Sequence, residues 1–100
     1  MALARILYLN ANHGFVAMEN LLRVASDDLQ ADIVAITEPY ASRGRISAPG
    51  WTVYHQGNAA VLTRPHLRAL QVPLKSSNSV CLCLQDFALV VGYILSLIHI

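Results

Sequence analysis

The first third of the chain sets a short apolar run, an amphipathic segment and a second apolar run one after another. Residues 5–10 (RILYLN) and 33–36 (IVAI) are the apolar runs, and each is typical of a buried strand. A helix is predicted between them, because apolar side chains recur at spacings of 3, 4, 3 and 4 at Phe15, Met18, Leu22, Ala25 and Leu29. The pattern predicts a βαβ unit, whose strands run parallel and whose crossover is right-handed.

The remainder of the chain favours antiparallel structure. A small, polar and basic loop is predicted after Tyr40 and through Gly50. Short strands separated by turn residues are then expected at 51–54, 59–63, 67–72, 80–84 and 87–94, with the last two forming a hairpin. The predicted fold class is therefore α/β tending to α+β, a βαβ unit followed by antiparallel strands.

Two polar residues stand where the strands of the predicted βαβ unit end. Parallel strands deliver their carboxyl ends to one edge of a sheet, so Asn10 and Glu38 are expected to face the same mouth. Pro39 is expected to hold Glu38 in an extended conformation. A carboxylate opposite an amide suits a hard cation such as Mg²⁺. The alternatives are a solvated strand-end glutamate and a turn-forming asparagine. Asp32 begins the second strand, roughly 20 Å from Glu38 at about 3.3 Å per residue, too far to share a metal ion.

Four other residues could have either a binding role or a structural role. Arg43 and Arg45 follow the Glu-Pro-Tyr segment, and two guanidinium groups beside the mouth could grip a phosphodiester backbone, the alternative being a solvated basic loop. Trp51 and Tyr54 could stack on bases, but residues that flank a strand are more often part of the core, and core packing is the prediction.

The cysteines and histidines offer no site of their own. Cys81 and Cys83 alternate with leucines and so point to one face of a strand, where small buried side chains are predicted rather than a zinc site. None of the four histidines has an acidic neighbour in the sequence that would suggest a charge pair.

The composition is unusual for so short a chain. Of its 100 residues, 55% are hydrophobic and 13% are charged, about half the charged share of an ordinary soluble domain. So many apolar residues exclude disorder, and a net charge of +1 excludes a polybasic tail. No secretory signal is expected at the start, no apolar run reaches the roughly 20 residues that span a bilayer, and an intracellular location with free thiols is predicted. The low charge suggests apolar faces that another part must cover.

Several segments together resemble one family. They are ILYLNANHG at 6–14, ADIVAITEPY at 31–40, GNAAVLTR at 57–64 and LVVGYI at 89–94. This set is similar to the endonuclease/exonuclease/phosphatase (DNase I-like) family, and above all to the endonuclease domain of non-LTR retrotransposon polyproteins. The resemblance implies the N-terminal portion of a four-layered α/β sandwich, with residues 1–100 as an incomplete domain.

The resemblance also implies roles for individual residues. Asn10 matches the active-site asparagine, Glu38 the glutamate that binds Mg²⁺ or Mn²⁺, and Tyr93 a tyrosine near the scissile phosphate. Asn12 matches a second polar position that contacts DNA. The implied activity is metal-dependent nicking of DNA, which primes retrotransposition, and the full-length element would act in the nucleus.

The chain departs from the family in ways that bear on activity. His13 stands where the branch often has a basic or small residue. Asp-x-Asn and the final Ser-Asp-His are missing, so the half of the site that activates water is absent and the chain is expected to be inactive alone. Residues 95–100 (LSLIHI) resemble translated sequencing-adapter sequence and are interpreted as foreign.

Two alternative functions follow from other features. One is a phosphomonoesterase of the same superfamily, and the other is a non-enzymatic α/β module that binds a protein through an uncovered sheet. A Glu38 side chain that projects into bulk solvent, away from Asn10, would favour the binding module.

Overall fold

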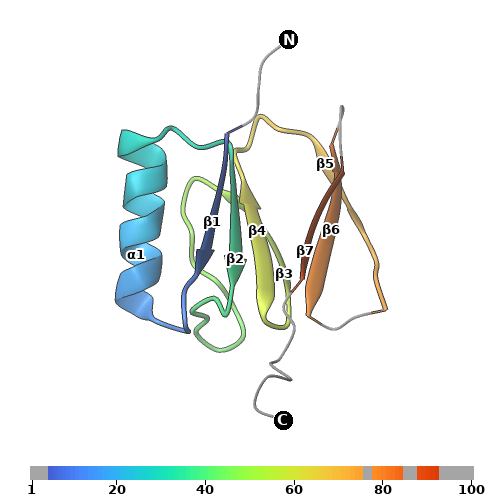
Figure 1. Ribbon diagram of the computed structural model, residues 1–100, viewed down its shortest axis with the longest axis horizontal. Helices are drawn as coiled ribbons and strands as arrows, with labels where there is room; N and C mark the ends of the chain where they lie inside the picture. Colours follow the sequence, from blue (N-terminus) through green and yellow to red (C-terminus); the bar gives the residue numbers. More distant parts are fainter. Residues whose placement is uncertain (1–4, 76–77, 85–87, 93–100) are drawn as a thin grey trace.

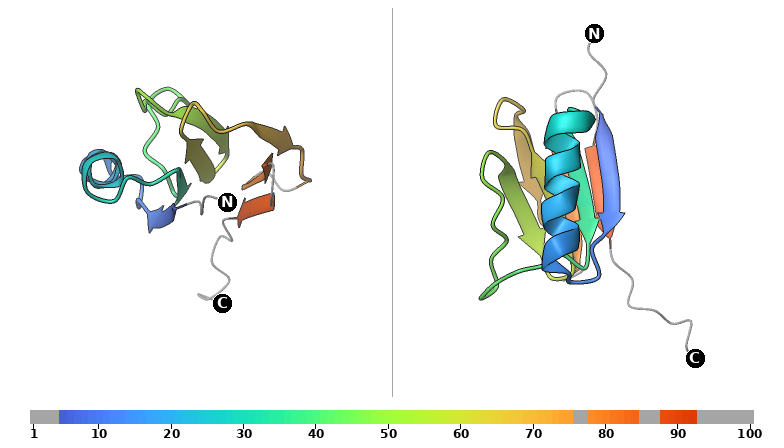
Figure 2. Two further views of the ribbon diagram at one scale, coloured as in Figure 1. Left: turned by 90° about the horizontal axis from the view of Figure 1, so that it is seen from above. Right: turned by 90° about the vertical axis from the view of Figure 1, so that its left-hand side faces the viewer.

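The computed structural model describes residues 5–75, 78–84 and 88–92 of the chain, which form a helix and two β-sheets. The helix α1 (Phe15–Arg23) continues into a π-helical turn, η1 (Val24–Asp28). It packs on one face of the first sheet, and the second sheet covers part of the other face (Figures 1 and 2). Among the described residues, no helix is long and apolar enough to cross a membrane.

The first sheet contains the predicted βαβ unit and a hairpin. Its strands lie in the order β1-β2-β4-β3, with bounds Ile6–Asn10, Ile33–Thr37, Ala59–Thr63 and Thr52–Gln56 respectively. β1 and β2 pair in parallel and in register from Ile6 opposite Ile33 to Asn10 opposite Thr37, which confirms the prediction. β4 then adds to β2 in the antiparallel sense and separates it from β3.

The second sheet is an antiparallel meander of β5 (Ala69–Val72), β6 (Ser79–Leu84) and β7 (Ala88–Gly92). The β6–β7 pairing confirms the hairpin predicted from the sequence. The later strands do not follow one another in a single sheet, because β3 and β4 join the first sheet and β5 to β7 form the second. The fold is thus α+β, as the sequence indicated.

Two apolar cores lie on opposite faces of the first sheet. Val34, Ile36 and Leu62 face α1, whereas Ile33 and Val61 face the second sheet, and all are fully buried. A strand that is buried on both faces carries apolar residues continuously rather than in alternation. This is why β2 and β4 were visible in the sequence as unbroken apolar runs.

The helix buries a slightly different stripe from the predicted one. Met18 and Ala25 are buried as expected and Leu21 joins them, while Phe15 and Leu29 at the two ends of the stripe are exposed. The Leu29 N–H donates to the carbonyl of Val24, five residues earlier, at 3.0 Å. Such a widened turn rotates the residues that follow relative to an α-helical stripe, which accounts for the exposure of Leu29.

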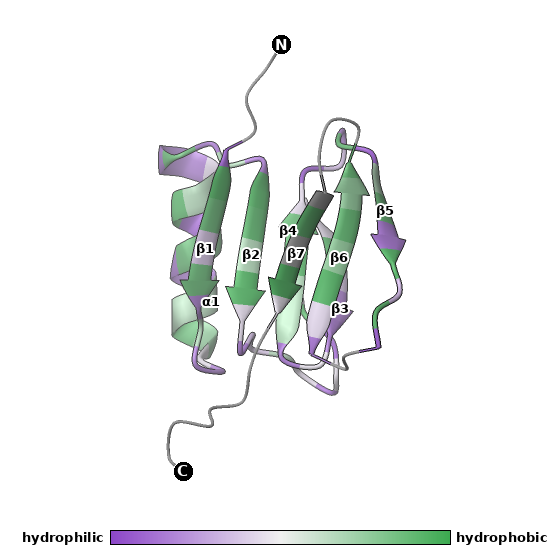
Figure 3. Cartoon of the chain, turned by 45° about the vertical axis from the view of Figure 1, so that its right-hand side comes forward, coloured by the Kyte–Doolittle hydropathy of each residue, from purple (hydrophilic) through white to green (hydrophobic). Residues whose placement is uncertain are grey.

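The outer face of the second sheet carries apolar side chains that no described residue covers. Cys83 is exposed and Cys81 is partly exposed, so the prediction of two buried cysteines was wrong, although both thiols are free. They do share a face of β6, as predicted, but it is the outward one: Leu70, opposite Cys83, is 70% exposed. Most of β6 is hydrophobic (Figure 3). The sequence predicts that Leu82 and Cys83 point to opposite faces of β6. It does not indicate which of these faces the rest of the protein covers.

Thr63 provides a first prediction. Its side chain is fully buried, and its Oγ1 has no hydrogen-bond partner within the described part of the chain. Because a buried hydroxyl without a partner costs about 1–3 kcal/mol, Thr63→Val is expected to raise the free energy of unfolding by about 1 kcal/mol. Urea denaturation measures this change, and a loss of stability would show that the hydroxyl has a partner. Thr52→Val, at an exposed position opposite Thr63, is the matched control.

Candidate functional site

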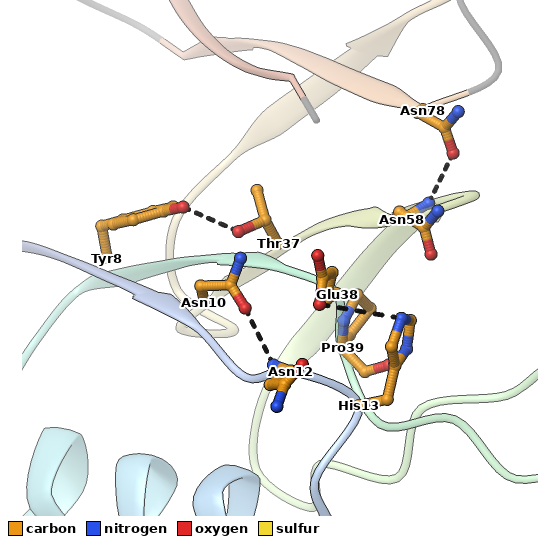
Figure 4. A network of polar contacts seen from close by, with 9 residues as sticks. All are labelled: Tyr8, Asn10, Asn12, His13, Thr37, Glu38, Pro39, Asn58 and Asn78. Atoms are coloured by element: carbon orange, nitrogen blue, oxygen red, sulfur yellow. Dashed lines mark hydrogen bonds and ion pairs between the residues drawn. The ribbon is translucent and has the colours of Figure 1, made fainter. Parts of the chain in front are cut away.

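Three strand ends meet at one edge of the first sheet, which we call the mouth. It comprises Asn10, Asn12, His13, Glu38 and Asn58 (Figure 4). Main-chain hydrogen bonds join the three segments: the Ala11 N–H donates to Thr37 O at 2.9 Å, His13 N–H to Glu38 O at 2.7 Å, and Glu38 N–H to Asn58 O at 2.9 Å. The backbone alone therefore fixes how these residues lie relative to one another.

Glu38 adopts a left-handed backbone conformation, with φ of 50°. The expectation that Pro39 would keep it extended was wrong. This conformation costs an ordinary residue about 1–2 kcal/mol, and it persists because both backbone polar groups of Glu38 are fixed by neighbouring loops. A strained residue whose surroundings hold it in place is a feature that clusters at functional sites.

The segment after β1 forms a tight turn from Ala11 to Gly14. Asn12 and His13 both have positive φ, 50° and 57°, and the Gly14 N–H donates to Ala11 O at 2.8 Å. The Asn10 Oδ1 accepts a hydrogen bond from the Asn12 N–H at 2.9 Å, so Asn10 has the turn-forming role that the sequence offered as an alternative. This bond also orients the amide of Asn10 at the mouth.

The Glu38 carboxylate lies near His13, a residue that the sequence did not single out for this contact. His13 Nε2 is 3.9 Å from Glu38 Oε1, and His13 Nδ1 is 3.3 Å from the Pro39 carbonyl. The Glu38 side chain is only 18% exposed and does not project into bulk solvent. The two residues are 25 positions apart, so an inspection of sequence neighbours could not find the pair.

Asn58 and Asn78 extend the mouth toward the second sheet and were also missed. The Asn58 N–H donates to Asn78 Oδ1 at 2.8 Å (Figure 4), while the Asn58 carbonyl accepts a hydrogen bond from the Glu38 N–H. The sequence gives Gly57-Asn58 a place in a segment that resembles the family, but it does not predict this contact. No local signal in the sequence joins residues that are 20 positions apart.

The oxygen atoms at the mouth suit a small hard cation. Glu38 offers a carboxylate and Asn10 an amide, and the register of β1 and β2 places Asn10 opposite Thr37, next to Glu38. In the described ranges, no three histidine, cysteine or acidic side chains gather in one place. Mg²⁺ is often held by one or two carboxylates while water and substrate fill its other positions, so this sparse set fits it. Asp32 lies at the other end of β2 and accepts a hydrogen bond from the Arg5 N–H.

Arg43 and Arg45 belong to a defined turn rather than to an irregular loop. Ser42 and Arg45 exchange two main-chain hydrogen bonds of 2.8 and 3.0 Å, and Arg43 and Gly44 between them have φ of 54° and 76°. Two successive positive φ values with this pairing are typical of a type I′ turn. Both arginine side chains are exposed.

Trp51, directly before β3, and Tyr54, within β3, pack against the cores as predicted. Trp51 is partly buried against the core beneath α1, and the Arg64 guanidinium lies 3.9 Å from the centre of its ring. Tyr54 packs against the core between the sheets. Tyr93 and residues 95–100, which also carried predictions, lie outside the described residues.

Comparison with known proteins finds a similar domain among the solved structures. No family model and no curated protein matches the sequence. Among solved structures, the endonuclease domain of TRAS1, a telomere-specific non-LTR retrotransposon, matches with a TM-score of 0.66 and 25% sequence identity over 88% of this chain. The chain spans 42% of the length of that domain. In fold and in sequence, it is thus similar to part of a retrotransposon endonuclease domain.

Proposed function

We propose that the chain is part of a DNA-nicking endonuclease domain of the non-LTR retrotransposon kind, and that the mouth is the metal-binding half of its active site. One observation carries the proposal. Glu38 is held in a strained conformation at the edge of the sheet where Asn10 also ends its strand, in a fold similar to that of such a domain. A full-length element of this kind would act on nuclear DNA.

Different residues would bind the metal ion and the DNA backbone. Glu38 and Asn10 would hold Mg²⁺ or Mn²⁺, and the ion, when bound, polarises a phosphoryl oxygen and stabilises the leaving oxygen. Glu38 supplies the negative charge, and Asn10 adds an oxygen without further charge. Asn12 and the exposed Arg43 and Arg45 would contact the sugar-phosphate backbone, because charged and amide groups commonly hold phosphate oxygens.

Water activation is the part that this chain does not supply. The sequence contains neither Asp-x-Asn nor Ser-Asp-His, the motifs that the resemblance requires for orienting and deprotonating the attacking water. We therefore expect that the 100-residue chain does not nick supercoiled plasmid above background in Mg²⁺, as measured by conversion to open circles. Turnover that Glu38→Gln removes would contradict the half-site proposal.

Metal binding tests the proposal without requiring turnover. Titration calorimetry with Mn²⁺ is expected to show one weak site, which Glu38→Gln weakens more than tenfold because the only carboxylate of the mouth is lost. Asn10→Ala is expected to weaken it less. Asp32→Asn is the matched control, since it removes a carboxylate at the opposite end of the same strand. Equal binding by wild type and Glu38→Gln would contradict the proposal.

A further inference from the structure

Two aromatic side chains stand together beside the mouth. Phe15 begins α1, two residues after His13, and Tyr40 lies two residues after Glu38. Their ring centres are 5.3 Å apart with an interplanar angle of 71°, an edge-to-face pair. Phe15 remains 52% exposed and Tyr40 36% exposed, so the contact leaves much of both rings accessible.

A shallow cavity adjoins this pair, between α1 and the type I′ turn from Ser42 to Arg45. Glu19, Ser42, Arg45 and Ser47 line it together with the two aromatic rings and the apolar side chains of Met18 and Leu22. Its volume of about 70 Å³ is room for about two water molecules, so a nucleobase cannot enter it. A base could lie only across the exposed rings, with the polar side chains of the cavity beside its edge.

Charge distinguishes this surface from an ordinary exposed apolar contact. Arg45 lines the cavity and Arg43 stands at the tip of the same type I′ turn, whereas Glu19 is the only acidic residue of the lining. The two main-chain hydrogen bonds between Ser42 and Arg45 order the backbone that carries both guanidinium groups before any ligand binds. Exposed rings beside a basic group are the combination that binds single strands, in which bases stack on aromatic side chains and phosphates meet cations.

We propose that Phe15, Tyr40 and Arg45 form a nucleotide subsite for an unpaired stretch of DNA beside the mouth. The base stacks on the aromatic pair and its phosphate meets Arg45. A base within a duplex already stacks on its neighbours, so this subsite selects a strand that is unpaired next to the nicking position. The inference deepens the proposed function by naming the form of the substrate, but the binding itself requires no metal ion.

The test is binding of a fluorescein-labelled ten-nucleotide single strand, measured by anisotropy in EDTA. Tyr40→Leu and Phe15→Leu are each expected to weaken binding about tenfold, because one stacked base is lost while an apolar side chain keeps the helix contact. Arg45→Gln is expected to reduce the slope of log affinity against log salt by about 0.7, as one phosphate contact disappears. Val16→Leu, an exposed neighbour on α1, is the control and should bind as wild type does.

Other outcomes would overturn the inference. Unchanged affinity in both aromatic variants, each with a wild-type circular dichroism spectrum, would show that the bases stack elsewhere. Equal affinity for the single strand and a blunt duplex would remove the selection for unpaired DNA. No binding by wild type would also overturn it and would favour a protein partner for this surface. Because EDTA is present throughout, none of these results bears on Mn²⁺ binding at Glu38, so the two proposals can fail separately.

Discussion

Leu62→Ala is expected to lower the free energy of unfolding by about 2–5 kcal/mol, the usual cost of cutting a buried leucine to alanine. Leu62 is fully buried beneath α1, and its neighbours across the sheet are Val34 and Val53. The side chain therefore sits where the helix meets the centre of the first sheet, and little can move to fill the space it leaves. The free energy of unfolding of a small domain is only about 5–15 kcal/mol, so this loss is a large share of it.

Urea denaturation followed by the fluorescence of Trp51, the only tryptophan, measures the loss directly, because Trp51 packs against the same core. Leu70→Ala is the matched control: the same atoms are removed from a side chain that is 70% exposed, and the change should stay within about 0.5 kcal/mol. Similar losses for the two variants would show that the first sheet and α1 do not form the stable core.

Glu38→Gly is expected to have two opposed effects, a loss of Mn²⁺ binding and a gain in stability. Glycine adopts positive φ without the penalty paid by a residue with a Cβ, although it adds conformational freedom to the unfolded chain. The net gain should be about 0.5–1 kcal/mol. A residue that lowers stability where it stands, and whose removal abolishes metal binding, is kept for function rather than for folding.

Glu38→Gln separates the two effects. It removes the charge and keeps the Cβ, so Mn²⁺ binding should fall while stability stays near that of wild type. Thermal unfolding and calorimetry on the three proteins measure both quantities. If Glu38→Gly is less stable than Glu38→Gln, the backbone at this position is not strained in the folded protein.

The βαβ unit was predictable because its signals are local. The spacing of Met18, Leu22 and Ala25 defines a helix, two apolar runs flank it, and a crossover of this length leaves parallel pairing as the only common arrangement. From that geometry follows the placement of Asn10 and Glu38 at one edge, which the register of β1 and β2 shows. The partition of the later strands between two sheets was not predictable, since it depends on pairings between distant residues such as Ala35 and Val61.

The finer features of the mouth escaped prediction for a related reason. The rule that a residue before proline is extended is a local preference, and at Glu38 it is overridden by hydrogen bonds from His13 and to Asn58, which lie 25 and 20 residues away along the chain. The contact between His13 and Glu38 and the bond between Asn58 and Asn78 arise in the same way. Only the assembled sheet brings these side chains together.

The hydrogen bonds that join the three segments of the mouth are made by main-chain atoms. Substitutions of the side chains around the rim, at Asn12, Tyr40, Arg43 or Arg45, remove none of the atoms that make those bonds. The position of Glu38 is therefore independent of the residues that would read the substrate. Under the proposed function, the surface that contacts DNA could therefore change by single mutations while Glu38, the proposed ligand of the metal, keeps its position.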